Sequence, residues 1–214
     1  MSKVTKKLNE YINFKDGFFI EAGSYDGIFL SNTLALEKEL NWNGLLIEPN
    51  FEKYLECLNN RKDSTTVLAA LCSFKEYKDN KILYISDNGP ISSINNLRHK
   101  RRKFIIRKKN KLGLIPTYAI PFSHLMKNLG FDKQAIDFFS LDVEGYEFRV
   151  LNGIDFDKHK PKYFLVEVYS YDKERIFKFF KKNNYKEPIN LSNFNKKNNT
   201  NWDGLHQDYL FVSK

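Results

Sequence analysis

Carboxylate side chains and glycines alternate in one short segment near the start of the chain. A short apolar run is followed there by Glu21, Gly23, Asp26 and Gly27, and a helical pattern comes next. Glycine allows positive φ and lets a ligand approach the backbone closely. The Gly-x-x-x-Gly spacing differs from the Gly-x-Gly-x-x-Gly of dinucleotide enzymes, and the two acids disfavour a pyrophosphate. The segment therefore indicates either a pocket for a ligand with a cationic part or a plain strand–turn–helix corner with surface acids.

A third carboxylate, Glu48, ends the next apolar run, 25 residues after Gly23. A carboxylate at that point of an open parallel sheet can accept hydrogen bonds from both hydroxyls of a ribose. A ribose joined to a positively charged group describes S-adenosylmethionine (SAM) better than it describes NAD. The pattern therefore favours a SAM site and disfavours an NAD-type oxidoreductase.

Two further carboxylates, Asp142 and Glu144, stand where another apolar run meets Gly145. On a strand they would share one face. There they could act as a general base, a metal-binding pair or an acidic wall for a cationic ligand. The structural alternative is that one of them caps a helix that begins near Gly145.

These residues need a scaffold in which several strand ends meet. Apolar runs predict strands, and spacings of three and four residues predict helices. The strands are expected at 18–20, 44–49, 65–71, 81–86, 118–120, 136–142, 163–168 and 209–212, and the helices at 4–14, 30–40, 51–61, 122–129 and 176–180. This order predicts a parallel sheet covered by helices on both faces. Ligands bind beyond the carboxyl ends of such strands.

The composition limits the class of protein. Of the 214 residues, 42% are hydrophobic and 15% aromatic, too many for a disordered chain. No apolar run is long enough for a transmembrane helix or a secretory signal. The only cysteines, Cys57 and Cys72, suit a reducing compartment. We therefore expect a cytoplasmic protein of one domain, 1–214, with a basic insertion or flap at about 87–115.

The net charge of +9 comes from one segment. Residues 98–111 hold nine Lys or Arg and no acid, and the rest of the chain carries 26 residues of each sign. Three interpretations stay open: a solvated helix or flap, a clamp for an anionic acceptor such as a phosphorylated sugar, or a contact with nucleic acid or a membrane surface. The polar run just before it, with Ser92 and Ser93, suits sugar hydroxyls and turns equally well.

Three segments together resemble the FkbM family of SAM-dependent methyltransferases. They are 19–27 with 31–33 and 36–37, then 42–50, and then 136–147 with 150–153. The likeness runs from about residue 17 to 168 in the family's order. It does not extend to 85–115 or to the Asn-rich tail.

The resemblance implies a fold and a cofactor pocket. The fold is an α/β class I methyltransferase (Rossmann-like) sandwich, with a seven-stranded, mostly parallel sheet whose last strand is antiparallel. The implied SAM-binding residues are Glu21, Gly23, Ser24, Tyr25, Asp26, Asn32, Glu48, Pro49, Ala70 and Asp142. Glu48 would hold the ribose, and Asp142 would lie near the methyl donor.

The resemblance also implies methylation of a sugar hydroxyl, on a glycan, a nucleotide-sugar or a lipid-linked saccharide. A sugar hydroxyl is a weak acid, so a base or a divalent cation at its oxygen would help. Asp142, Glu144 and His206 are the expected catalytic residues, with Glu167 and Asp208 as further candidate bases. Related sugar methyltransferases suggest Mg²⁺, for which Asp142 and Glu167 occupy suitable places. Acceptor contacts are expected from Ser92, Ser93, Arg98, Arg101 and Arg102.

Two other functions compete with this hypothesis. The basic segment 98–111 would serve an RNA-directed SAM methyltransferase, whose RNA binding should weaken steeply with salt. A methyltransferase fold without its chemistry would instead be a non-catalytic binding module. The joint presence of Glu21, Gly23, Glu48 and Asp142 argues against the binding module.

Overall fold

The computed structural model describes residues 3–79, 81–86, 114–195, 197, 200, 202 and 204–214. Most of the expected basic insertion at 87–115 lies outside these residues. The basic segment 98–111 and the acceptor contacts expected from Ser92, Ser93, Arg98, Arg101 and Arg102 also lie outside them. None of the described helices is both long and apolar enough to cross a membrane.

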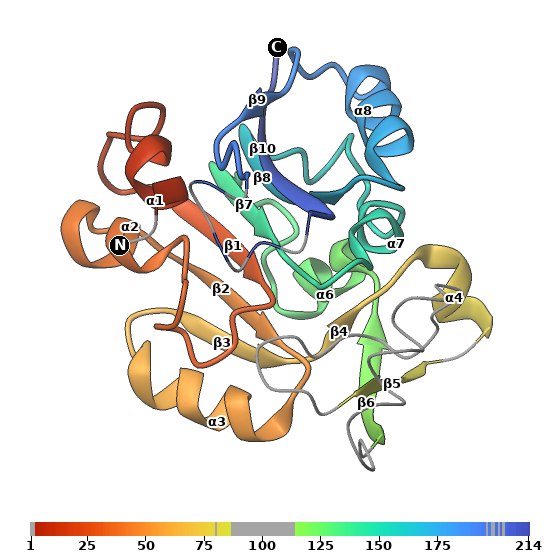
Figure 1. Cartoon of the computed structure of the whole chain (residues 1–214). Coiled ribbons are helices and arrows are strands. Elements are labelled where there is room, and N and C mark those ends of the chain that lie inside the picture. The colour runs from red at the N-terminus through yellow and green to blue at the C-terminus, as the bar shows by residue number, and fades with distance from the viewer. Residues whose placement is uncertain are drawn as a thin grey trace.

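A seven-stranded sheet forms the centre of the molecule (Figure 1). In spatial order its strands are β3 (Thr65–Leu68), β2 (Asn43–Glu48), β1 (Phe18–Ala22), β7 (Phe138–Leu141), β8 (Tyr163–Tyr169), β10 (His206–Val212) and β9 (Ile189–Asn190). The first five pair in parallel, and β10 runs antiparallel to both of its neighbours. The predicted class I methyltransferase sheet, with its last strand antiparallel, is confirmed.

Helices cover both faces of this sheet. Successive strand residues point to opposite sides, and because both sets are apolar, each face needs a covering layer. Ile20 and Ile47 belong to one core with α6 (Phe122–Asn128), α7 (Glu147–Leu151) and α8 (Lys173–Lys182). Phe19 and Leu46 belong to the other core with α1 (Lys3–Leu8), α2 (Leu34–Leu40) and α3 (Phe51–Asn60). The continuous apolar strands thus reflect burial on both faces, as predicted.

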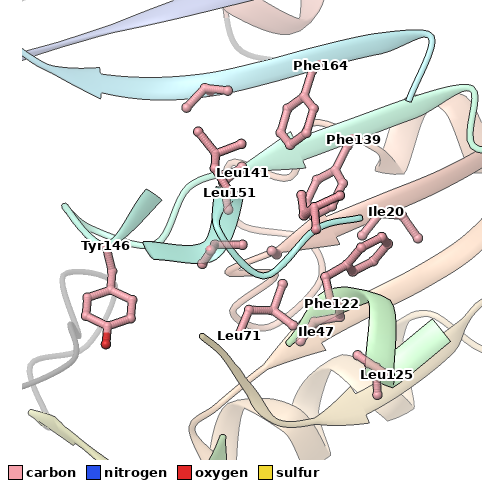
Figure 2. Packing of buried hydrophobic residues seen from close by; sticks show 14 of the residues in the cluster. Ile20, Ile47, Leu71, Phe122, Leu125, Phe139, Leu141, Tyr146, Leu151 and Phe164 are labelled. Carbon is pink, nitrogen blue, oxygen red and sulfur yellow. The ribbon is translucent and has the colours of Figure 1, made fainter. Parts of the chain in front are cut away.

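Aromatic side chains pack closely at the centre of the sheet. The rings of Phe139 in β7 and Phe164 in β8 stack with their centroids 4.5 Å apart. Phe122 of α6 packs against Phe139 from the helical layer, with centroids 5.0 Å apart (Figure 2). These contacts fix the two strands whose carboxyl ends carry Asp142 and Glu167, so these acids are positioned by the core.

The single strand predicted at 65–71 is wrong, because it divides between two sheets. β3 pairs with β2, whereas β4 (Ala70–Leu71) pairs with β6 (Leu114–Ile120) in a small sheet that also contains β5 (Ile82–Ser86). The change occurs at Ala69, whose N–H still donates to the carbonyl of Glu48 at 3.2 Å. The small sheet therefore begins beside the carboxyl end of β2, and α4 (Phe74–Asp79) lies between β4 and β5 in the chain.

Two predicted helices are shorter than their apolar patterns. The one expected at 30–40 begins at Leu34, because the N–H of Asn32 donates to Glu21 Oε1 at 2.7 Å and is used outside the helix. The one expected at 4–14 ends at Leu8, where the N–H groups of Tyr11 and Ile12 both bond to the Leu8 carbonyl in a tight turn. Ile12 is nevertheless fully buried, which explains the helical spacing.

Candidate active site

A pocket of about 450 Å³ opens beyond the carboxyl ends of β1, β2, β7 and β8. The residues that the sequence singled out provide much of its lining: Glu21, Gly23, Ser24, Tyr25, Asn32, Glu48, Pro49, Ala70, Asp142, Glu144, Glu167, His206 and Asp208. Asp26 does not line it. The structure therefore brings together side chains that lie up to 187 residues apart in the sequence.

Gly23 is the point where three strands meet. Its N–H donates to the carbonyl of Ile47 in β2 at 3.0 Å. Its φ of +84° is a conformation that glycine tolerates best. A Cβ atom here would lie 1.8 Å from the carbonyl oxygen of Asp142, beyond the end of β7. The absence of a side chain thus sets how closely the ends of β1 and β7 approach.

Glu48 is buried, and backbone donors hold its carboxylate. Oε2 accepts from the N–H of Tyr25 at 2.8 Å, and Oε1 accepts from the N–H of Asn50 at 2.8 Å. Burial raises the pKa of Glu48 to about 7, although both hydrogen bonds favour the ionised form. Each carboxylate oxygen keeps a further lone pair for a donor from a ligand.

The raised pKa of Glu48 predicts pH-dependent cofactor binding. Ribose hydroxyls donate to the ionised carboxylate, so affinity should rise as the pH passes upward through about 7. With binding confined to the ionised form, affinity for S-adenosylhomocysteine (SAH) should increase about tenfold between pH 6 and pH 8. Calorimetric titration across this range measures the slope. A Glu48→Gln variant should show weaker and flatter binding, and an unchanged slope in it would assign the effect to another group.

Glu21 and Asp26 organise the loop that follows β1. The buried carboxylate of Glu21 accepts from the Ser31 hydroxyl at 2.8 Å and from the Thr33 hydroxyl at 2.6 Å, in addition to the Asn32 N–H. Asp26 Oδ1 accepts from the N–H groups of the next turn at 2.9 and 2.7 Å. Both acids were expected to contact SAM, but their described hydrogen bonds are to the loop itself.

Arg61, which the sequence analysis did not select, fastens the same loop from the far side. Its guanidinium is fully buried and donates to Glu37 Oε2 at 3.0 Å and to the carbonyl of Gly27 at 2.9 Å. It also donates to the hydroxyls of Ser31 and Thr33 at 3.2 and 3.1 Å. A single arginine after a helix belongs to no sequence pattern that would predict this role.

Loss of this guanidinium should destabilise the fold strongly. In Arg61→Met the buried carboxylates of Glu37 and Glu21 lose the cation that they share. Breaking a buried ion pair in this way should lower the free energy of unfolding by about 3–5 kcal/mol. Urea unfolding measures the loss. The solvent-exposed pair of Lys158 with Asp155 offers a control outside this network, because Lys158→Met should lower the free energy of unfolding by less than about 1 kcal/mol. Equal effects of the two variants would contradict the role of Arg61.

The other end of the pocket is acidic. One carboxylate oxygen each from Asp142, Glu147 and Glu167 lies within 4.8 Å of the others. Burial raises the pKa of Glu147 to about 8, and burial together with neighbouring acids raises the pKa of Glu167 well above its usual value. Glu144 stands beside them and accepts from the Tyr169 hydroxyl at 3.1 Å. Glu147 was not among the selected residues, although it lies in the same segment as Asp142 and Glu144.

Strand β10 adds two polar residues to this end. Its antiparallel register sets Asp208 opposite Glu167 and His206 opposite Tyr169. His206 Nε2 lies 3.5 Å from Glu167 Oε1, and the His206 ring contacts the rings of Tyr169 and Phe194. Burial and the charge of Asp142 raise the pKa of Asp208 to about 7. The arrangement can bind a cation, and it can take up a proton from a neighbouring hydroxyl.

Comparison with known proteins places the chain in a family. The family model described as the methyltransferase FkbM domain matches residues 21–187. No curated protein matches the chain. The solved FkbM methyltransferase of Methylobacillus flagellatus KT shares 13% identity at a TM-score of 0.56; the match covers 99% of this chain and 48% of that one, so this chain spans about half the length of that relative.

A second fold relative is a METTL16 methyltransferase domain, at 10% identity and a TM-score of 0.53, covering 100% of this chain and 83% of that one. Identities this low support the fold alone. The family model, by contrast, spans most of the chain and includes the three segments that carried the resemblance, apart from residues 19 and 20. The chain therefore belongs to the FkbM family of SAM-dependent methyltransferases.

Proposed function

We propose that this protein transfers the methyl group of SAM to a hydroxyl of a carbohydrate acceptor. The observation that carries the proposal is one continuous pocket with Glu48 at one end and an acidic group around Asp142 at the other. The first end has a carboxylate for ribose hydroxyls, and the second has bases for an acceptor hydroxyl. Family membership supports the methyl transfer, and the acceptor class rests on the sequence resemblance and the chemistry of the second end.

In the proposed complex, residues at the carboxyl ends of β1 and β2 would hold the cofactor. Glu48 accepts from the ribose hydroxyls, while Pro49 and Ala70 border the same part of the pocket. Gly23, Ser24, Tyr25 and Asn32, which also line the pocket, would hold the methionine portion. Glu21 and Asp26 act through the loop whose N–H and hydroxyl groups they bind.

The transfer itself needs alignment and removal of one proton. The acceptor oxygen attacks the methyl carbon as the carbon–sulfur bond breaks, so SAH and an ether are formed. Asp142 takes the hydroxyl proton, since it lies at the pocket end of β7 and is exposed toward the space that an acceptor would occupy. Glu144 and His206 flank this position and are the next candidates for contact with the acceptor. Holding oxygen, carbon and sulfur in line supplies much of the remaining rate.

A divalent cation such as Mg²⁺ is part of the proposal. The fit is chemical, because Asp142 and Glu167 offer hard oxygen ligands beside the acceptor end of the pocket. Such an ion would stabilise negative charge on an acceptor oxygen. Anionic acceptors are favoured by the nine basic residues of 98–111.

Methyl-labelled SAM tests the acceptor class. The protein is incubated with a panel of oligosaccharides, nucleotide-sugars and RNA, and transfer of label is measured with and without Mg²⁺. We expect label on the saccharides in an ether that resists alkali. Label on RNA alone would overturn the carbohydrate assignment and favour the RNA-directed enzyme. Binding of SAH without transfer to any saccharide would also count against this acceptor class.

A further inference from the structure

A third carboxylate lies beside Asp142 and Glu167, the two acids included in the proposed function as cation ligands. Asp142 follows β7, Glu167 lies in β8, and Glu147 is the first residue of α7. Oxygens from all three lie within 4.8 Å of one another, although they come from separate elements. Such a spacing lets one ion contact all three groups, whereas like charges at this distance repel each other without one.

Two of the three acids each carry a buried oxygen without a donor. Glu147 is 1% exposed and Glu167 is 7% exposed. Their Oε2 atoms are inaccessible to solvent and accept no hydrogen bond from any residue that the structure describes. A buried carboxylate oxygen without a partner is costly. This need for a partner is independent of the clustering of the three acids, and a bound cation would meet it.

Glu147 is held in place by its other oxygen. Oε1 accepts from the N–H groups of Val143 and Gly145 at 3.1 and 2.8 Å. The turn between them passes through Glu144 and Gly145 at φ values of +57° and +89°, which directs both N–H groups to the same atom. One oxygen of Glu147 thus fixes the turn, and the second remains for a ligand. Little side-chain freedom would be lost on binding an ion.

We propose that Glu147, together with Asp142 and Glu167, binds one divalent cation at the acceptor end of the pocket. Three carboxylate oxygens suit Mg²⁺, Mn²⁺ or Ca²⁺ better than a metal that prefers sulfur ligands. Glu147 and Glu167 form the buried side of the site. Asp142 is exposed and borders the pocket, so the ion can enter and keep positions for water or an acceptor. Its action on an acceptor hydroxyl rests on the proposed function, but its binding does not.

Titration with Mn²⁺ alone tests the site. The electron paramagnetic resonance signal of free Mn²⁺ counts the bound ions, and Mg²⁺ is then added as a competitor. We expect one Mn²⁺ per chain, displaced by Mg²⁺, and a loss of affinity of at least about tenfold in Glu147→Gln. This substitution keeps Oε1 and replaces the charged Oε2. Glu174→Gln, which alters an exposed acid of α8, should bind Mn²⁺ as the unaltered protein does.

Two results would overturn the site. One is the absence of stoichiometric Mn²⁺ binding to the unaltered protein, as expected if the acids share protons instead. The other is unchanged Mn²⁺ affinity in Glu147→Gln. Thermal melting checks that each variant is folded, and Glu167→Gln replaces Glu147→Gln if the latter does not fold. SAH is titrated separately, so that SAH binding without Mn²⁺ binding removes the cation site and leaves the proposed function standing.

Discussion

An Asp142→Asn variant is expected to lose turnover by a factor of about 10²–10⁴ while it stays folded and binds SAH. Asparagine has nearly the shape of aspartate, but it cannot take up a proton from a sugar hydroxyl. The side chain is exposed at the pocket end of β7, so its replacement removes no core contact. The backbone N–H of Asp142, which donates to the carbonyl of Ala22 at 3.1 Å, is unaffected.

Turnover of Asp142→Asn is measured at saturating SAM with the acceptor that the labelling experiment identifies. SAH affinity is measured on the same preparation, and we expect it to change no more than a few-fold. Asp157→Asn, in an exposed loop outside the pocket, should keep the turnover of the unaltered protein. Near-normal turnover in Asp142→Asn would remove Asp142 from the chemistry. A matching loss of SAH affinity would instead assign it to cofactor binding.

The second large effect is expected from Gly23→Ala. The added Cβ would meet the carbonyl oxygen of Asp142 at 1.8 Å, and neither backbone can yield without opening the junction of β1 and β7. Overpacking and the positive φ together should lower the free energy of unfolding by about 2–5 kcal/mol. The loop that follows also lines the cofactor pocket, so SAH binding should fall below detection even where the protein remains folded.

Gly130→Ala separates the cost of the positive φ from the cost of the steric clash. Gly130 has a φ of +80°, close to the +84° of Gly23, but a Cβ there would meet nothing within 4 Å. Its replacement should therefore cost only the conformational part, about 1–2 kcal/mol, and leave SAH affinity unchanged. Urea unfolding and SAH titration of both variants make the comparison. Equal losses in the two would show that the close approach of β1 and β7 does not matter.

Much of the pocket could be predicted because strand ends are visible in a sequence. Apolar runs of β1, β2 and β7 end in Glu21, Glu48 and Asp142, and parallel pairing brings such ends to one edge of the sheet. The fold class followed from the same order of runs together with the family resemblance. Ala70 lines the pocket as expected, although the strand that was expected to carry it divides at Ala69.

The remaining features depend on contacts that have no local signature. Arg61 acts on the loop after β1 from the end of α3, and nothing near Arg61 in the sequence indicates the pairing. The late start of α2 has the same origin, since the N–H of Asn32 binds Glu21 instead of joining the helix. Glu147 resembles an ordinary first-turn acid of a helix. Only the fold, which packs α7 against β8, places a carboxylate oxygen of Glu147 near Asp142 and Glu167.

The most direct test of this account is calorimetric titration of the protein with SAH, beside Glu48→Ala. We expect the unaltered protein to bind one SAH per chain at pH 8. Glu48→Ala should remain folded and bind more weakly by about 1.5–3 kcal/mol for each hydrogen bond lost to the ribose. A cooperatively melting protein that binds no SAH would contradict the central claim and identify a methyltransferase fold without its cofactor. Equal affinity in the two proteins would contradict the ribose assignment of Glu48.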